Sequence, residues 1–250
     1  EVYAAVREVG VAFHAAQGGL GALRRARDVV REPADADWRR VGGTDAHVDA
    51  LTVRYPGRDD AAASGVTAAF PAGNITALTG PSGAGKSTVL AALVGALSAE
   101  AEVQGAVRVP RGPIAYAAQA PRLVAASAAE ELALTGASAG EIERMLAVLD
   151  LGSVAGRHPA LLSPGERRRV AVARALLLAP GAVLVVLDEP TAHLDAAHAE
   201  QMRLEIGRLR TDAPVVLVSH EPETVALASI RIPITPPAAG APAHAAAAAA

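Results

Sequence analysis

The nine residues GPSGAGKST (80–88) constrain the fold of this chain more than any other stretch. They follow NITALTG (74–80), which has the length and apolar content of a β-strand, and they run into KSTVLAALVGAL (86–97), which is predicted to be a helix. A glycine-rich turn between a strand and a helix fits the pattern GxxxxGK[ST], in which backbone N–H groups surround phosphate oxygens. The sequence therefore predicts a phosphate site at this junction.

Each polar residue of the motif has an expected role. Lys86 is expected to reach the β- and γ-phosphates, the Ser87 hydroxyl to bind Mg²⁺, and Thr88 to assist at the α-phosphate. A glycine-rich turn with a chance lysine is the alternative, and the flanking strand and helix argue against it. The other motif residues expected at the phosphates are Gly80, Ser82, Gly83 and Gly85.

A pair of acids follows a second apolar run, AVLVVLDEP (182–190). Asp188 is expected to hold Mg²⁺ through water, and Glu189 is placed to polarise an attacking water as a general base. An acidic strand end is common in α/β proteins, so this prediction depends on the phosphate motif. This run and APVVLVSHE (213–221) are typical of buried parallel strands with a site at their C-terminal ends.

Strands alternate with helices along the chain, so the predicted fold class is α/β. LTVRY (51–55) and PIAYAAQ (113–119) are predicted to be further strands, and serine-led capping boxes predict helices after Ser127 and Ser138. A third helix start lies in LSPGERRRVAVARALL (162–177), with a serine at the N-cap and proline at the first helical position. Because a helix N-terminus attracts anions, this start raises the question of which anion it faces.

Composition narrows the class of partner. The 250 residues suffice for one sizeable α/β domain with appendages, and the formal net charge of −3 gives no support for a nucleic-acid partner. The absence of cysteine excludes disulfides, thiolate metal sites and a cysteine nucleophile. No uninterrupted apolar run reaches the roughly 18 residues expected of a membrane span.

These motifs together resemble those of the ATP-binding cassette (ABC) ATPases. The resemblance covers about residues 48–234 and includes a glutamine after a strand, then LSPGE, LDEP, TAHLD and VSH in that order. It implies a P-loop NTPase core with a mainly parallel sheet, an antiparallel β subdomain and a helical subdomain at about 120–178. The implied nucleotide-binding domain spans 47–236 and binds ATP with Mg²⁺, and a low-complexity tail follows at 237–250.

Several site residues are carried over from this resemblance alone. Tyr55 resembles the aromatic that stacks on adenine, and Gln119 resembles the residue that senses Mg²⁺ and the transmembrane partner. Asp195 resembles the residue that couples the two sites of a dimer, and His220 resembles the switch histidine that contacts the γ-phosphate. Simpler interpretations stay open: an edge-strand aromatic for Tyr55, a loop amide for Gln119, and a capping or core histidine for His220.

The resemblance also supplies an anion for the helix start in LSPGE (162–166), the signature segment. In this family the signature helix faces the ATP held by a second, head-to-tail subunit. Ser163 and the N–H groups near Gly165 are therefore expected to donate to that γ-phosphate. Two positions depart from the usual LSGGQ: Pro164 removes one N–H donor, and Glu166 adds negative charge unless it closes a capping box. Most of the arginines at 167–169 are interpreted as a solvated basic face.

Residues 1–46 resemble the cytoplasmic end of a last transmembrane helix and its linker in exporter-type ABC proteins. They are most similar to cysteine/glutathione (thiol reductant) exporter subunits of the CydD/CydC type, which support cytochrome bd assembly. This implies an upstream transmembrane domain, a second ABC subunit in a heterodimer, and a place at the cytoplasmic face of the inner membrane. The alternatives are an importer subunit with a separate permease, and a soluble ABC ATPase acting on DNA or ribosomes. The acidic charge and the lack of long heptads or a second cassette disfavour the soluble ATPase.

Overall fold

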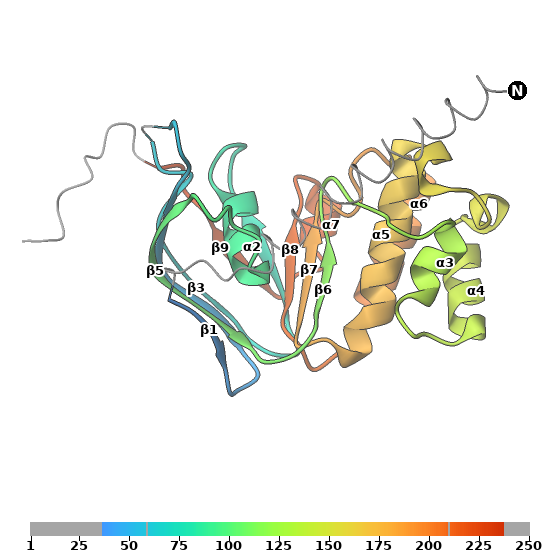
Figure 1. The fold of residues 1–250 in the computed structure, drawn as a ribbon, viewed down its shortest axis with the longest axis horizontal. Helices are drawn as coiled ribbons and strands as arrows, with labels where there is room; N and C mark the ends of the chain where they lie inside the picture. The colour runs from blue at the N-terminus through green and yellow to red at the C-terminus, as the bar shows by residue number, and fades with distance from the viewer. Residues whose placement is uncertain (1–36, 59, 210, 238–250) are drawn as a thin grey trace, which may run out of the picture.

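The computed structural model describes residues 37–58, 60–209 and 211–237. Two β-sheets stand side by side with helix α2 (Lys86–Val94) between them, and further helices cover the outer face of the parallel sheet (Figure 1). This arrangement confirms the predicted α/β class with a parallel and an antiparallel sheet. Residues 238–250, which make up nearly all of the expected low-complexity tail, lie outside the described residues.

The first sheet has five strands that are all parallel, in the order β6-β7-β8-β4-β9. Four of them, β4, β6, β7 and β8, had been predicted, and β7 and β8 were predicted from apolar runs that end in polar residues. Their carboxyl ends meet at one edge of the sheet, where a site is expected in parallel α/β folds. The bounds are β4 (Ile75–Thr79), β6 (Ile114–Ala117), β7 (Leu184–Asp188), β8 (Val215–Val218) and β9 (Ile230–Pro233).

Strand β7 shows why these runs are apolar throughout. Leu184 and Val186 belong to the hydrophobic cluster shared with α2 and the other sheet, whereas Val185 and Leu187 belong to the cluster shared with the outer helices. Successive side chains of a strand point to opposite faces, and here both faces are buried. The apolar run therefore reports burial on two sides, and it ends where the strand reaches the cleft at Asp188.

The second sheet is largely antiparallel, in the order β1-β5-β2-β3. Strand β2 pairs antiparallel with β3 and β5, and β1 pairs parallel with β5. The sheet begins earlier than the expected boundary at residue 47, because β1 lies within the segment interpreted as a linker. Its sequence, DWRRV, has no apolar alternation, and its place in the sheet depends on a partner far along the chain. The bounds are β1 (Asp37–Val41), β2 (Ala46–Arg54), β3 (Ala63–Phe70) and β5 (Glu102–Pro110).

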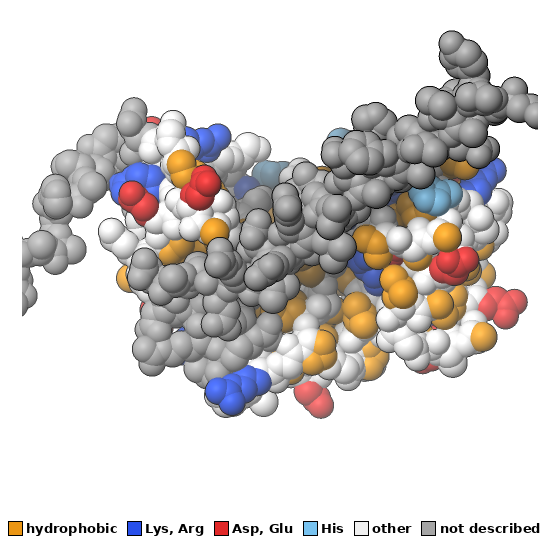
Figure 2. Space-filling model, viewed as in Figure 1, with side chains coloured by type: hydrophobic (Ala, Val, Ile, Leu, Met, Phe, Trp, Pro, Cys, Tyr) orange, Lys and Arg blue, Asp and Glu red, His pale blue; other side chains and the backbone are white. Residues whose placement is uncertain are grey.

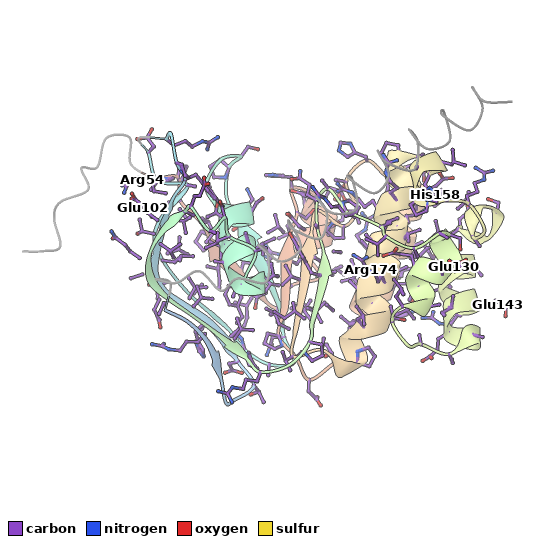
Figure 3. All side chains as sticks on the ribbon, in the orientation of Figure 1. Arg54, Glu102, Glu130, Glu143, His158 and Arg174 are labelled. Carbon is purple, nitrogen blue, oxygen red and sulfur yellow. The ribbon has the colours of Figure 1, made fainter. Side chains whose placement is uncertain are left out.

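Helix α5 covers the outer face of the parallel sheet, and α3 and α4 pack on α5 as the expected helical subdomain. Arg174 extends from α5 toward α3 (Figure 3), where it donates to the fully buried carboxylate of Glu131. The other helical segments are α3 (Ala128–Ala133), α4 (Ala139–Val148), α5 (Pro164–Leu178), α6 (Ala196–Gly207), α7 (Pro222–Val225) and the 3-10 turns Gly152–Val154, Pro159–Leu161 and Ala179–Gly181.

The described surface carries mixed charge. On the face drawn in Figure 2, acidic and basic side chains of the described residues lie scattered among each other. Among the described residues, no helix combines the length and apolarity that a membrane crossing needs. The expected end of a transmembrane helix falls on residues before 37, which are outside the described part of the chain.

Candidate nucleotide-binding site

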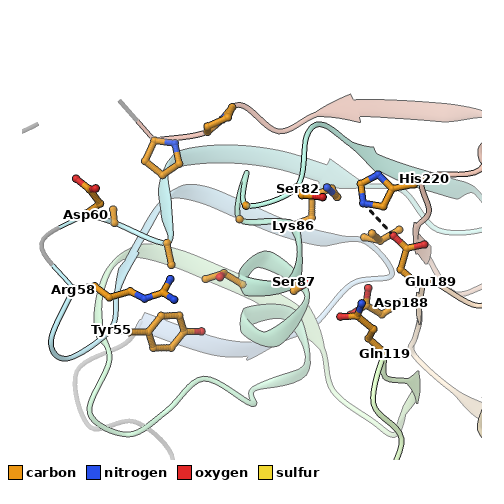
Figure 4. Close-up of a pocket in the computed structure, with 18 residues that line it drawn as sticks. Tyr55, Arg58, Asp60, Ser82, Lys86, Ser87, Gln119, Asp188, Glu189 and His220 are labelled. Atoms are coloured by element: carbon orange, nitrogen blue, oxygen red, sulfur yellow. Dashed lines mark ion pairs between the residues drawn. The ribbon is translucent and has the colours of Figure 1, made fainter. Parts of the chain in front are cut away.

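A cleft of about 750 Å³ lies at the carboxyl edge of the parallel sheet and reaches the second sheet. Tyr55 and Arg58 line one end, and Gln119, Asp188 and Glu189 line the other (Figure 4). The phosphate motif lies between these two ends, around the start of α2. An elongated ligand with a planar group at one end and anionic groups at the other matches this division.

Two glycines of the phosphate motif are required by close backbone approach. Gly80 has φ +141°, and a β-carbon there would lie 2.2 Å from the Ile234 carbonyl oxygen. Gly85 has φ +98°, and a β-carbon there would lie 2.4 Å from the Ala62 carbonyl oxygen. Only glycine adopts these conformations without a clash. The glycines thus hold the motif tightly against neighbouring backbone and leave its inner side open.

The start of α2 is prepared for an anion. Its N-cap is Gly85, and no side chain caps the first turn, so the N–H groups there lack the usual side-chain acceptor. Lys86 is only 6% exposed, and its ammonium donates to the Gly80 and Pro81 carbonyl oxygens at 2.8 and 2.9 Å. An ammonium has three donors, so a third one is available to a ligand. Helix start and ammonium together make a phosphate site.

Asp188 and Glu189 form a buried acidic pair at the end of β7. Burial, reinforced by the Glu189 carboxylate, raises the pKa of Asp188 to about 6, while Arg168 and Lys86 oppose the shift. The Asp188 Oδ1 atom is buried and has no hydrogen-bond partner. An orphaned carboxylate oxygen in a cleft that Ser87 also lines matches the oxygen ligands that Mg²⁺ prefers. The residues present therefore fit a divalent cation.

The backbone of Glu189 is held in an uncommon conformation. Its φ is +52°, in the left-handed region that non-glycine residues rarely occupy. The Glu189 N–H donates to the Val218 carbonyl at 2.9 Å, and its Oε1 lies 3.4 Å from His220 Nε2. Figure 4 shows these two side chains facing each other at the cleft. Such outliers cluster at functional sites, where surrounding contacts enforce them.

The structure brings most of the predicted site residues together. Eleven line the cleft: Tyr55, Ser82, Gly83, Gly85, Lys86, Ser87, Thr88, Gln119, Asp188, Glu189 and His220. Gly80, the first residue of the motif, accepts a hydrogen bond from Lys86 through its carbonyl oxygen. The remaining three, Ser163, Gly165 and Asp195, do not line this cleft. Their placement fits the expectation that they serve another subunit's nucleotide.

The start of α5 has the predicted capping box. The Glu166 N–H donates to Ser163 Oγ at 3.2 Å, and the Ser163 N–H donates to Glu166 Oε2 at 2.6 Å. The hydrogen bond from the Ser163 backbone is the main cause of the lowered pKa of Glu166. The negative charge of Glu166 therefore interacts with the first turn of its own helix. Nearby, Gly165 faces the His193 carbonyl, and Asp195 caps α6 by accepting from the His198 N–H at 3.0 Å.

Sequence reasoning missed several residues around the cleft. Arg58, Asp60, Pro236 and Pro237 line it, although the low-complexity tail was expected to begin at residue 237. Arg168 was grouped with a solvated basic face, and that interpretation is wrong for it. Only 7% of Arg168 is exposed, because its guanidinium lies behind the acidic pair. No sequence signal separates it from its arginine neighbours.

Comparisons with known proteins found similar sequences. A sequence model described as ABC transporter matches residues 63–192. The molybdenum import ATP-binding protein ModC of Mesorhizobium japonicum is 44% identical over 88 residues, which are 34% of this chain and 23% of that protein. The spermidine/putrescine import ATP-binding protein PotA of Pseudomonas fluorescens is 38% identical over 97 residues, covering 38% and 26%. The chain thus spans about a quarter of the length of these curated relatives.

Solved structures have the same fold. A structure described as the ATP-binding subunit of an ABC transporter matches with TM-score 0.63 and 25% identity, over 76% of this chain and 85% of that one. An ATP-binding cassette described as a dimer in a post-hydrolysis state with ADP and Pi matches with TM-score 0.64 and 24% identity, over 76% and 94%. The second likeness is a likeness of fold alone.

Proposed function

This chain belongs to the ABC transporter family, and on that premise we propose that it is the ATP-binding and ATP-hydrolysing domain of a membrane transporter. The observation that carries the proposal is the composition of one cleft. It combines an uncapped helix start, a buried lysine and a buried acidic pair at the end of strand β7. Phosphoryl chemistry needs these three elements, because they bind the phosphates, hold a cation and orient a water.

In this proposal each lining residue has one task. Lys86 and the α2 start hold the β- and γ-phosphates, and Tyr55 stacks on the adenine at the other end of the cleft. Glu189 accepts a proton from the water that attacks the γ-phosphorus, while the bond to the β–γ bridging oxygen breaks. His220, 3.4 Å from Glu189, contacts the γ-phosphate and keeps the carboxylate oriented.

The proposed cation is Mg²⁺. Ser87, Asp188 and Gln119 would hold it, and when bound it supplies positive charge that neutralises the phosphate oxygens. Asp188 is well suited to this task because its buried Oδ1 lacks any other partner.

The active unit is proposed to be a head-to-tail dimer with a second ABC subunit at the cytoplasmic face of the membrane. Ser163, Gly165 and Asp195 lie outside this chain's cleft, which supports roles at the shared interface. A transmembrane domain completes the transporter, and a heterodimer remains the finer proposal.

Two directions of transport have support. The named relatives are importer subunits, but the matches cover only 34–38% of this chain. The segment 1–46 favours an exporter, with thiol reductants such as cysteine and glutathione as the proposed cargo for cytochrome bd assembly. The coding sequence upstream of Glu1 distinguishes them. Six hydrophobic spans in the same reading frame support the exporter, and their absence supports the importer subunit.

Glu189→Gln tests the proposed chemistry. The amide keeps the size of the side chain but cannot accept a proton, so ATP binding should persist while turnover falls by about 10²–10⁴-fold. ATP-loaded dimers should accumulate, and size-exclusion chromatography with ATP and Mg²⁺ would detect them. Near-normal hydrolysis by a homogeneous preparation of this variant would remove Glu189 from the role.

A further inference from the structure

Arg168 is a buried cation that the proposed chemistry does not use. It lies on α5, five residues after the N-cap Ser163, and is 7% exposed. A buried charge is costly unless hydrogen bonds satisfy it. The neighbouring arginines 167 and 169 are less buried, and the Arg167 guanidinium donates to the Leu162 carbonyl at 2.7 Å, within the start of the same helix. The contacts of Arg168 are different in kind.

The two ends of the Arg168 guanidinium bind two separate loops of the cleft. Nη1 donates to the Glu189 carbonyl oxygen, and Nη2 donates to the Gln119 carbonyl oxygen. Glu189 directly follows β7 and Gln119 follows β6, the neighbouring strand. Because the guanidinium is a rigid planar fork, it fixes the distance between these two carbonyls as well as their directions.

The Glu189 peptide is thereby held on both sides. Its N–H donates to the Val218 carbonyl of β8, and its carbonyl accepts from Arg168 and from the Ala192 N–H at 3.2 Å. These contacts together hold the left-handed φ of +52°, a conformation that a non-glycine residue keeps only where its surroundings enforce it. The direction of the carboxylate toward the cleft and His220 follows from that backbone conformation.

We propose that Arg168 is a positioning residue for hydrolysis, which ties the backbones of Glu189 and Gln119 to the start of α5. The inference rests on the proposed ATPase function. In a head-to-tail dimer, the start of α5 meets the nucleotide of the other subunit, while Arg168 contacts the loops of its own site. A shift of the signature segment on closing is therefore transmitted to the water-orienting glutamate of the same chain.

The test compares Arg168→Gln and Arg168→Lys with wild type in the full-length assembled transporter, using ATP with Mg²⁺. We expect kcat to fall about 10- to 100-fold in Arg168→Gln, as for lost supporting hydrogen bonds at a site, with KM and the Kd for ATP nearly unchanged. Arg168→Lys keeps the charge but lacks the planar guanidinium that donates to both carbonyl oxygens, so it should recover only part of kcat. Arg167→Gln is the matched control, and its kcat should stay within about twofold of wild type, as for surface substitutions.

The outcomes separate the inference from its premise. A wild-type assembly that hydrolyses no ATP contradicts the proposed function itself. With an active wild type, an unchanged kcat in Arg168→Gln overturns the positioning role. If Arg168→Gln fails to fold, Arg168→Lys decides: loss of ATP affinity in step with kcat marks a merely structural arginine, whereas a fall in kcat alone supports the proposal.

Discussion

The starts of α2 and α5 are both anion-attracting helix N-termini, yet they are built in opposite ways. The start of α2 has a glycine at the N-cap and no side-chain cap, and it lies in the cleft. The start of α5 has a complete capping box made by Ser163 and Glu166, and it lies outside the cleft with Ser163 exposed. The first leaves its N–H groups to a ligand, whereas the second satisfies part of them within the chain.

This difference indicates which nucleotide each helix start serves. An uncapped start fits a ligand bound by the same chain, since the ligand takes the place of the cap. A capped start is held in its conformation by its own chain, so it stays ordered before a ligand of the partner subunit is bound. The Ser163 hydroxyl accepts from the Glu166 N–H, and its hydrogen bond with the Glu166 carboxylate helps to lower the pKa of that acid. The predictions below test this division, beginning with the largest expected effect.

Lys86→Ala and Ser163→Arg should separate the two starts by nucleotide affinity. Loss of a charged hydrogen bond to phosphate costs about 1.5–3 kcal/mol, so Lys86→Ala should weaken ATP binding by roughly 10- to 150-fold. Ser163→Arg should leave binding to the isolated chain unchanged, because Ser163 does not line its cleft. Titration calorimetry at concentrations that exclude dimers measures both. Equal losses in the two variants would place the start of α5 at the chain's own nucleotide.

Asp188→Asn should stabilise the nucleotide-free protein, because the Asp188 carboxylate is buried beside the Glu189 carboxylate. The pKa of Asp188 is about 6 in the folded state against the usual 3.8, so the folded state binds more protons between these values. Stability from this group is therefore present below pH 3.8 and lost as pH rises through 6. At pH 8 the asparagine variant should be more stable by up to about 3 kcal/mol.

Denaturant unfolding at several pH values, with a chelator present, measures this effect. The advantage of the asparagine variant should vanish below about pH 4, where the carboxyl is protonated in both states. Glu166 at the start of α5 has the opposite sign, because its pKa is lowered and its charged form is favoured. A pH-independent advantage of Asp188→Asn would show that its buried charge is not the cause.

The capping boxes of α4 and α5 give the smallest and most closely matched comparison. Ser138 and Ser163 make the same pair of hydrogen bonds, with Glu141 and Glu166. Replacing either serine by alanine should cost about 1 kcal/mol of stability, the typical value for an N-cap. Only Ser163→Ala should also lower the ATPase rate of the assembled transporter. Equal rates in the two variants would reduce Ser163 to the cap of its own helix.

How much of this molecule could be predicted from its sequence depends on whether a feature is local or rests on contacts between distant residues. The phosphate motif, the buried strands and the capping boxes of α4 and α5 are local patterns, and each was predicted within a few residues. At the start of α3 the predicted capping box is only half formed, because Ser127 accepts from the Glu130 N–H and the Glu130 side chain does not return the bond. Strand β1 was missed because its partner β5 lies about 70 residues along the chain and its own sequence shows no alternation. Arg168 was misassigned because its burial depends on the carbonyls of Gln119 and Glu189, 49 and 21 residues away.

The proposed roles of the residues at the start of α5 cannot be tested on a single chain. The capping box was predicted from Ser163 and Glu166, and the structure confirms it. The phosphate that Ser163 is proposed to contact belongs to another subunit, so neither the spacing of residues nor this chain's cleft tests it.

Mixing two inactive variants tests the central claim most directly. Ser163→Arg keeps a sound α2 start but blocks the signature segment, and Lys86→Ala keeps a sound signature segment but loses its phosphate site. In a mixed dimer, one of the two sites combines the sound halves. We therefore predict that hydrolysis returns on mixing, up to one site per mixed dimer, in the full-length transporter or a tethered pair. In a heterodimer the two substitutions are divided between the partners. No recovery in a preparation shown to contain mixed dimers would contradict the account, and the start of α5 would serve only its own helix.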